Sequence, residues 1–245
     1  MDPYTGNHLC SAVFIDRGTV LTPASCVNTT NGEVRDPFPM VVANTALVDG
    51  KDSGAKWMRA CEQIIHHKYT GNGKGQNIAL LRVNGTVQHP LSIGNIARAE
   101  AWEKVGSEGE LVSAGWYRPW RMGGPSKVGQ RIAGWKIVAP EECRDLLGQG
   151  SDEDVCAQPP VINHYKYDLG APMFWSNGSD LHHPQVLLGM TSYEGPNAAG
   201  LLNLTLNRDW LASSGVGQSF VQVNDHKDCR NTNGMVGQTD QHEEL

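Results

Sequence analysis

The sequence predicts an all-β protein of the β-barrel type, and two observations favour this class. Short segments that mix apolar and polar residues recur along the chain, and Gly, Pro, Asn and Asp stand between them as turn signals. Many short strands with turns between them are typical of β-barrels. The chain has 245 residues, of which 39% are hydrophobic, so it can bury a sizeable core and can fold as one unit.

The first strands can be placed in order along the chain. Residues 8–15 alternate well enough for a strand, and the turn Asp16-Arg17-Gly18 leads into a second strand over residues 19–23. Residues 28–39 are polar, with Gly and Pro, and predict a loop. Residues 40–48 and 57–65 are expected to form two further strands.

Charge and hydropathy exclude several classes of protein. The net charge of −6 and the pI near 5.8 disfavour a nucleic-acid partner. No run of 18 apolar residues exists, so no membrane-spanning helix is expected. The first five residues are polar and unlike a signal peptide, so we expect the chain to be a mature or truncated form of a longer precursor.

Three seven-residue segments follow one another in a fixed order: residues 21–27 (LTPASCV), 77–83 (NIALLRV) and 167–173 (YDLGAPM). They resemble the catalytic loops L-T-A-A-H-C-V, D-I-A-L-L-K-L and G-D-S-G-G-P-L of the trypsin/chymotrypsin-like (S1-type) serine proteases. Ser25 stands where that family has histidine, Asn77 where it has aspartate, and Leu169 where it has the nucleophilic serine. Their order and their spacings of 52 and 92 residues make the resemblance specific.

The resemblance covers about residues 8–213 and implies a trypsin-like domain over residues 1–214, with two packed antiparallel six-stranded β-barrels and a short C-terminal helix. It places the barrels at about residues 1–97 and 98–206, and the helix at about 207–213 with Asn207 as its cap. Residues 111–116, 185–193 and 200–206 resemble strands of the second barrel. Residues 215–245 form a polar tail that we expect to be disordered.

The same resemblance predicts that catalysis is lost. Leu169 cannot act as a nucleophile, Ser25 cannot act as a base near neutral pH, and Asn77 carries no charge to orient a base. The family also has glycines where this chain has Ser11 and Tyr167, and Tyr167 falls in the oxyanion hole. We therefore expect an inactive homologue, a pseudoprotease without a cofactor. A residual hydrolase with another nucleophile is the least favoured alternative.

The former specificity pocket is expected to be altered. Asn163 falls at the position that sets primary specificity in the family, and Tyr165 and Tyr167 add bulk beside it. Asp168 is kept, but the amine that pairs with this aspartate in the family has no counterpart here. Either the amine lies on a separate chain or the region stays in a zymogen-like state, and we favour the second. The reshaped groove would suit a protein-binding surface.

The cysteines predict disulfides and an oxidising compartment. By the resemblance, Cys10 pairs with Cys26 and Cys143 pairs with Cys156. Cys61 and Cys229 remain, although six cysteines allow fifteen connectivities. A bond between these two would tie the tail to the first barrel; otherwise either thiol could bridge to another chain.

Four N-glycosylation sequons agree with a secreted glycoprotein. Asn28, Asn84 and Asn177 fall in predicted surface turns, where a glycan can be carried. Asn203 lies within a predicted strand and is the least expected to be modified.

No metal site is expected. Adjacent histidines on a strand point to opposite faces, so the pairs His66-His67 and His182-His183 are poor chelators, and we expect surface or loop histidines. Residues 48–53 carry two carboxylates, which is too few for calcium. Residues 242–245 (HEEL) resemble an ER-retrieval signal, so the secretory-pathway lumen is the alternative to secretion.

These observations predict a secreted, non-catalytic protein-binding cofactor, decoy or scaffold. Its expected partners are other proteins, such as proteases or cascade components, with no nucleic acid and no membrane span. The alternative is a structural subunit of a larger disulfide-linked secreted complex.

Overall fold

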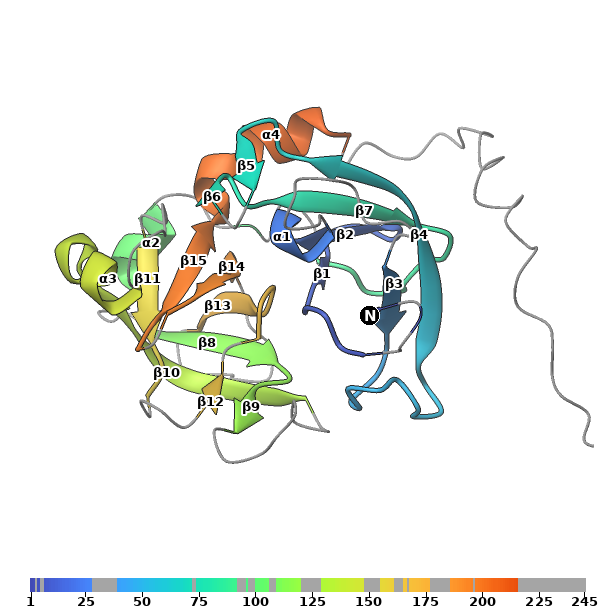
Figure 1. Cartoon of the computed structure of the whole chain (residues 1–245), viewed down its shortest axis with the longest axis horizontal. Coiled ribbons are helices and arrows are strands. Elements are labelled where there is room, and N and C mark those ends of the chain that lie inside the picture. Colours follow the sequence, from blue (N-terminus) through green and yellow to red (C-terminus); the bar gives the residue numbers. More distant parts are fainter. Residues whose placement is uncertain are drawn as a thin grey trace, which may run out of the picture.

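The computed structural model describes residues 1–2, 4, 7–27, 39–71, 74–91, 96, 100–105, 109–119, 129–147, 155–160, 165–166, 168–176, 186–195 and 197–215. The chain folds into two β-sheet bodies that lie side by side, with a short helix near the end of the described chain packed across the top (Figure 1). The all-β trypsin-like prediction is confirmed. No helix in the described ranges is long and apolar enough to cross a membrane.

The first body is a curled sheet of five strands in the order β1-β2-β7-β4-β3. The strands are β1 (Val13–Phe14), β2 (Thr19–Thr22), β3 (Met40–Ala43), β4 (Lys56–Ile65) and β7 (Ala79–Val83). All four pairings are antiparallel, and the short helix α1 (Ala24–Val27) follows β2 directly. A minor hairpin joins β5 (Tyr69–Gly71) to β6 (Lys74–Gly75).

The second body is a closed barrel of six strands in the order β10-β11-β15-β14-β13-β8. The strands are β8 (Glu110–Gly115), β10 (Gln130–Val138), β11 (Val155–Gln158), β13 (Pro172–Ser176), β14 (Val186–Glu194) and β15 (Ala199–Asn203). Two helices, α2 (Glu100–Lys104) and α3 (Pro140–Leu147), lie beside it, and β9 (Arg118–Pro119) pairs with β12 (Tyr165–Lys166). Closure leaves no free edge in this barrel.

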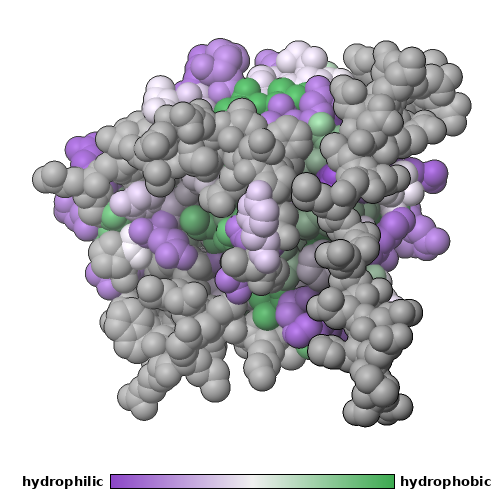
Figure 2. Space-filling model, turned by 45° about the vertical axis from the view of Figure 1, so that its right-hand side comes forward, coloured by the Kyte–Doolittle hydropathy of each residue, from purple (hydrophilic) through white to green (hydrophobic). Residues whose placement is uncertain are grey.

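The largest shared core lies between the two bodies. It contains Val13, Leu21, Ile78 and Leu80 from the first body and Phe174, Leu187, Met190 and Leu202 from the second, all at most 7% exposed. Burial of this apolar surface holds the two bodies together. Among the coloured residues of the face shown in Figure 2, apolar side chains lie between hydrophilic ones.

The first barrel departs from the prediction. Six strands were expected, and five are found in the described part of the chain, in a curled half-barrel that runs from β1 to β3. The strand expected over residues 8–15 shrinks to Val13–Phe14, and the one expected over 40–48 ends at Ala43.

The C-terminal helix is found, as α4 (Arg208–Ser213), after a 3₁₀ turn η2 (Leu204–Asn207). Asn207 stands at the N-cap position of α4, as predicted, but its side chain makes no capping hydrogen bond to this helix. Its amide nitrogen donates instead to the Gln76 Oε1 at 2.9 Å and to the Asn203 carbonyl at 3.0 Å. Asn203 caps the 3₁₀ turn through its bond from the Thr205 N–H.

Candidate active site and its replacement residues

Two of the three catalytic-loop positions lie in direct contact. Ser25 is in α1, and Asn77 lies two residues before β7 and is fully buried. The Asn77 Oδ1 accepts a hydrogen bond from the Ser25 N–H at 2.8 Å. The Asn77 amide donates to the Ser25 Oγ and to the Ser192 carbonyl, each at 3.1 Å. Asn77 therefore bonds α1 to the second body.

Leu169 lies in the turn before β13 and does not extend this contact. Its side chain packs against the core of the first body, together with Phe14 and Ile65. Its carbonyl accepts a hydrogen bond from the Ser11 N–H at 2.7 Å. Leu169 is therefore a packing residue, and its turn is held in place by a backbone hydrogen bond to Ser11.

The chemistry available to this arrangement is limited. An activated serine needs a base that takes its proton, and the base needs a partner that stabilises its charge. The group nearest to the Ser25 hydroxyl is an amide that donates to it, and an amide does not accept a proton near neutral pH. Among Ser25, Asn77 and Leu169, no side chain can act as a base for the Ser25 hydroxyl.

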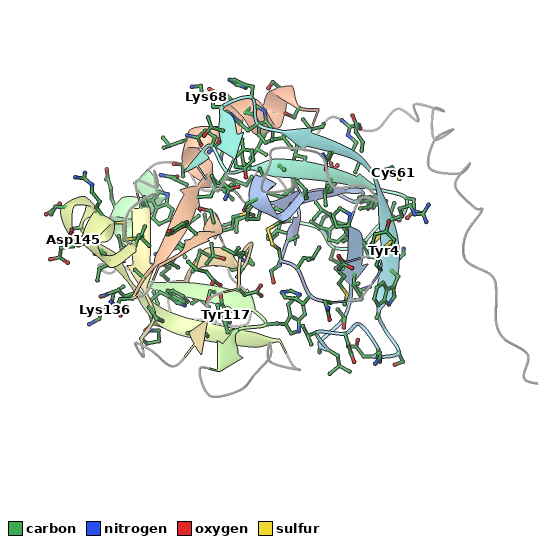
Figure 3. All side chains as sticks on the ribbon, viewed as in Figure 1. Tyr4, Cys61, Lys68, Tyr117, Lys136 and Asp145 are labelled. Carbon is green, nitrogen blue, oxygen red and sulfur yellow. A yellow bond between two sulfur atoms is a disulfide. The ribbon has the colours of Figure 1, made fainter. Side chains whose placement is uncertain are left out.

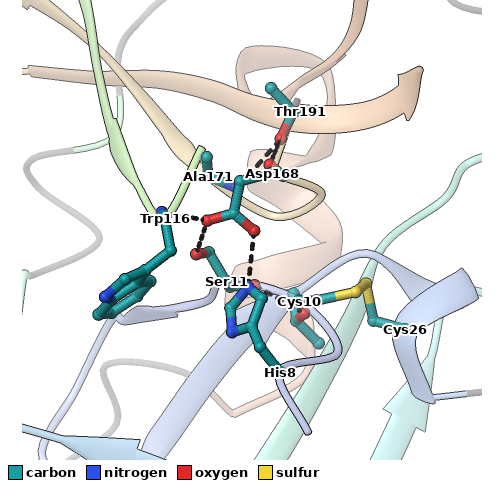
Figure 4. A network of polar contacts seen from close by, with 9 residues as sticks. His8, Cys10, Ser11, Cys26, Trp116, Asp168, Ala171 and Thr191 are labelled. Carbon is teal, nitrogen blue, oxygen red and sulfur yellow. Dashed lines mark hydrogen bonds and ion pairs between the residues drawn. A yellow bond between two sulfur atoms is a disulfide. The ribbon is translucent and has the colours of Figure 1, made fainter. Parts of the chain in front are cut away.

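A carboxylate beside the altered turn is held by an intact network (Figure 4). The side chain of Asp168 is 2% exposed, and its Oδ1 lies 2.9 Å from the His8 Nε2. Its Oδ2 accepts hydrogen bonds from the Ser11 Oγ at 2.5 Å and from the Trp116 N–H at 2.7 Å. The His8 ring also packs against the Trp116 ring, with centroids 5.6 Å apart. Two side chains, His8 and Ser11, and one backbone N–H, that of Trp116, thus surround the Asp168 carboxylate.

The backbone of the same turn is fixed as well. The Asp168 carbonyl accepts from the Thr191 hydroxyl and from the Ala171 N–H, and the Gly170 N–H donates to the Thr191 carbonyl at 2.7 Å. Gly170 has a φ of +80°, and a Cβ built there would lie 1.9 Å from the Ser11 carbonyl oxygen. Only glycine fits this position without moving the Ser11 backbone.

Sequence reasoning missed His8 and misread Ser11. Ser11 was seen only as a lost glycine, whereas its hydroxyl and its N–H both bind the turn at 168–169. Two signals could have found the network. A buried aspartate without its usual partner needs a replacement, and His8 stands two residues before the paired Cys10.

The predicted pocket residues are placed only in part. Asn163 and Tyr167 lie outside the described residues, and Tyr165 is described by its backbone alone, as a partner of Pro119 in the β12–β9 pair. A neighbouring aromatic is better defined. Tyr117 is fully buried, and Figure 3 shows it within the second body, away from the peripheral Lys136 and Asp145. Burial raises the pKa of its hydroxyl.

The two carboxylates of residues 48–53 have internal partners. Asp52 accepts from the Thr45 hydroxyl and from the Ala46 N–H, and these bonds lower the pKa of its carboxyl. The Asp49 carboxylate lies 3.4 Å from the Lys51 ammonium. Within the described ranges, no group of three potential metal ligands is found.

His66 lies in a loop between β4 and β5, as expected, but its side chain is buried. His66 is 6% exposed, and its ring stacks on His67 at 4.4 Å and lies 4.9 Å from the Trp210 ring. Its Nδ1 accepts the Lys68 N–H at 3.1 Å, so the neutral ring is the form that fits. Burial lowers the pKa of His66, and the neighbouring His67 and Lys68 lower it further. His182 and His183 lie outside the described residues.

The cysteines and sequons are found as follows. Disulfides join Cys10 to Cys26 and Cys143 to Cys156. Cys61 is also disulfide-bonded, and Cys229, its predicted partner, lies outside the described residues. Disulfides are consistent with secretion.

The sequons differ in accessibility. Asn84 is exposed in a turn after β7, although its Oδ1 accepts the Arg59 N–H at 2.9 Å. The Asn203 Oδ1 accepts from Thr205 and from the Trp102 indole N–H at 3.0 Å, so this side chain is already engaged. Asn28 and Asn177 lie outside the described residues.

Comparison with known proteins agrees with this geometry. A mutant of human heparin binding protein (CAP37) aligns at 17% identity and a TM-score of 0.60, over 85% of this chain and 86% of that chain. A second structure, described as the atomic-resolution structure of HBP, aligns at 17% identity and a TM-score of 0.61, over 85% of this chain and 86% of that chain.

The secreted serine protease VesC from Vibrio cholerae aligns at 19% identity and a TM-score of 0.61, over 87% of this chain and 44% of that chain. At these identities the likeness establishes the fold alone. No curated protein sequence matched the chain. The model of the family described as Trypsin matches residues 3–206, most of the sequence, and the chain therefore belongs to the trypsin family.

Proposed function

We propose that this chain is a non-catalytic member of the trypsin family that acts by binding other proteins, as a secreted cofactor, decoy or scaffold. The observation that carries the proposal is the contact between Ser25 and Asn77, together with the packing of Leu169 against the core of the first body. The hydrogen bonds of a catalytic triad are replaced there by neutral bonds, and the nucleophile is replaced by a core side chain. Loss of such a triad removes about six orders of magnitude in turnover.

The ordered structure around the Asp168 turn supports a binding role for the surface of the folded chain. The Asp168 turn is held by His8, Ser11 and the Trp116 N–H, so the fold does not need an inserted amine to order this region. A chain that keeps the barrel and the turn while its catalytic positions are replaced is suited to recognition.

A polyanion is disfavoured as the partner. Heparin is a polyanion, and the heparin binding protein shares the fold, but this chain carries a net charge of −6. A negatively charged protein is repelled by a negatively charged polymer over about 8 Å at physiological salt. Protein partners, including proteases of the same family, remain the favoured class.

Cys61 does not favour the disulfide-linked assembly. That alternative needs a cysteine available to a second chain, and Cys61 is already bonded within this one. The disulfide-linked subunit is therefore the weaker proposal.

The proposal is tested by labelling the purified protein with a fluorophosphonate probe and by measuring hydrolysis of peptide substrates. We expect no stoichiometric labelling and no turnover above the rate of the buffer. Trypsin serves as the positive control. Stoichiometric labelling of any serine in this chain would replace the proposal with an unconventional hydrolase.

A variant in which the three triad residues are restored tests whether the loss of the triad alone prevents catalysis. Ser25→His, Asn77→Asp and Leu169→Ser together should still give no trypsin-like activity, because His8 and Ser11 occupy the carboxylate that the family's amine binds. Robust peptide hydrolysis by this variant would show that only the triad was lost. Affinity capture from the native fluid, with and without reductant, then identifies the partners.

A further inference from the structure

Two of the four N-glycosylation sequons lie in described parts of the chain, and their surroundings differ. Asn84-Gly85-Thr86 forms a bend directly after β7, where Asn84 and Thr86 are both exposed. Asn203-Leu204-Thr205 joins the end of β15 to η2, where Asn203 and Thr205 are partly buried. A glycan is bulky and hydrophilic, so it needs an acceptor nitrogen that faces solvent.

The carboxamide of Asn84 has a fixed direction. Asn84 and Arg59 exchange two hydrogen bonds: the Asn84 N–H donates to the Arg59 carbonyl at 3.0 Å, and the Arg59 N–H donates to the Asn84 Oδ1 at 2.9 Å. Because a backbone N–H can only donate, the side-chain atom that it meets must be the carboxamide oxygen. The nitrogen Nδ2 occupies the other branch of the planar group. It therefore points away from β4 on an exposed side chain.

The rest of this sequon is also held against β4. A Cβ at Gly85 would lie 2.6 Å from the Met58 Cγ, so the absence of a side chain lets the bend approach the strand closely. The Lys56 ammonium donates to the Thr86 carbonyl at 2.6 Å. Contacts with one strand thus hold the backbone of the bend, while the side chains of its first and third residues stay exposed.

The carboxamide of Asn203 is covered instead. Its Oδ1 accepts from the Thr205 N–H at 3.0 Å, from the Thr205 hydroxyl at 2.6 Å and from the Trp102 indole N–H at 3.0 Å. The same indole lies over Gly189, which is opposite Asn203 in the β14–β15 pair: a Cβ there would be 3.6 Å from the Trp102 Cζ2. A glycan on Asn203 would have to displace this ring.

Asn84 also lies far from the altered catalytic positions. Asn77 bonds to Ser192 of the second body, and Asn84 follows it by seven residues along β7. At about 3.3 Å per residue of extended chain, the two residues are up to about 23 Å apart. Figure 1 shows β7 running away from the second body, so the bend at Asn84 lies at the outer end of the first body. This end has room for a bulky group.

We propose that Asn84 carries an N-linked glycan and that Asn203 stays unmodified. The Asn84 Nδ2 displaces a lipid diphosphate from the anomeric carbon of a lipid-linked oligosaccharide. The N–C bond forms, the C–O bond to the diphosphate breaks, and the nitrogen gives up one proton. The carboxamide oxygen is not consumed, so its hydrogen bond from Arg59 persists. The inference rests on the secretory compartment of the proposed function and is independent of the loss of catalysis.

The experiment measures occupancy at each sequon. The full chain is produced in eukaryotic cells behind a cleavable secretion leader, and its peptides are analysed by mass spectrometry before and after treatment with peptide N-glycosidase. Thr86→Ala removes the hydroxyl that the sequon requires, whereas the matched control Thr86→Ser keeps it. Both variants retain the backbone carbonyl that Lys56 binds and the contact of Asn84 with Arg59.

We expect a glycan at Asn84 in the wild type and in Thr86→Ser, and its loss in Thr86→Ala. Asn203 should be unmodified in all three proteins. Amide hydrogen exchange at Arg59 should be equally slow in the glycosylated wild type and in Thr86→Ala, because the glycan leaves the Asn84 oxygen in place.

Three results would overturn the proposal. The first is an unmodified Asn84 in the disulfide-bonded wild type, read from the secreted protein or, if it is retained, from the cell lysate. The second is a glycan at Asn203 in the folded protein. The third is faster exchange at Arg59 in the glycosylated protein than in Thr86→Ala. Labelling of the same preparation with the fluorophosphonate probe is a separate readout, so a failure of the non-catalytic proposal is distinguished from a failure of this one.

Discussion

Replacing Asp168 with alanine tests whether the His8 network holds the altered site together. The carboxylate receives hydrogen bonds at 2.5 Å from the Ser11 hydroxyl and at 2.7 Å from the Trp116 N–H, and it lies 2.9 Å from the His8 Nε2. Residue 168 as a whole is 5% exposed, so little water can replace the lost oxygen atoms. Asp168→Ala therefore leaves three polar groups without an acceptor in a buried place.

The magnitude follows from these contacts. A hydrogen bond to a charged group contributes about 1.5–3 kcal/mol to the free energy of unfolding, and three bonds to one group do not add fully. Three such bonds would sum to about 4.5–9 kcal/mol, and we take about 3–5 kcal/mol as the expected loss because they do not add fully. In a domain of this size each kcal/mol shifts the Tm by about 2–4 °C, so the Tm should fall by about 6–20 °C.

The measurement is thermal unfolding followed by circular dichroism, with two matched variants. Asp168→Asn keeps an oxygen for Ser11 and Trp116 and can turn an N–H toward His8, so it should lose less than half as much. Asp145→Ala removes an exposed carboxylate on α3 and should stay within about 0.5 kcal/mol of the wild type. If Asp168→Ala lowers the Tm no more than Asp145→Ala does, the network does not stabilise the fold and the reasoning is wrong.

Three further predictions concern the same surroundings. Gly170→Ala should lower the free energy of unfolding by at least ~2 kcal/mol, because the new Cβ meets the Ser11 carbonyl at a positive φ; an unchanged urea midpoint would contradict this. Asn77→Asp should cost about 1–3 kcal/mol at pH 7, since the amide donors to Ser25 and Ser192 are lost, and equal denaturant midpoints for both proteins would count against it. Burial lowers the pKa of His66, so below pH ~6.5 the unfolded chain binds a proton that the folded chain resists, and stability should fall as the pH drops from 7 to 5. His66→Phe should flatten this dependence, and an identical pH profile would refute it.

Local motifs predicted the fold because each contains both a strand and the turn beside it. Residues 77–83 carry Asn77 and the whole of β7, and residues 167–173 carry the Asp168 turn and the start of β13. Residues 21–27 likewise hold the end of β2 and all of α1. The second barrel could be predicted in the same way, because its strands are short, mostly buried apolar segments.

The half-barrel of the first body could not be predicted from alternation alone. Residues 8–15 have the composition of a strand, but the Ser11 N–H bonds to the Leu169 carbonyl and its hydroxyl bonds to Asp168. Those long-range bonds use backbone and side-chain groups that a longer β1 would need, so only Val13–Phe14 pairs with β2. Tertiary contacts therefore override the local pattern.

The His8 contact shows the same limit at the site itself. It spans 160 positions of sequence, and the chain offers nine histidines, so composition could not single out this one. The physical need was nevertheless visible, because a buried aspartate requires donors wherever they come from. His8, Ser11 and Trp116 meet that need with residues from both bodies. Their bonds join the bodies across the altered site, so the order of this region can persist after the catalytic side chains are gone.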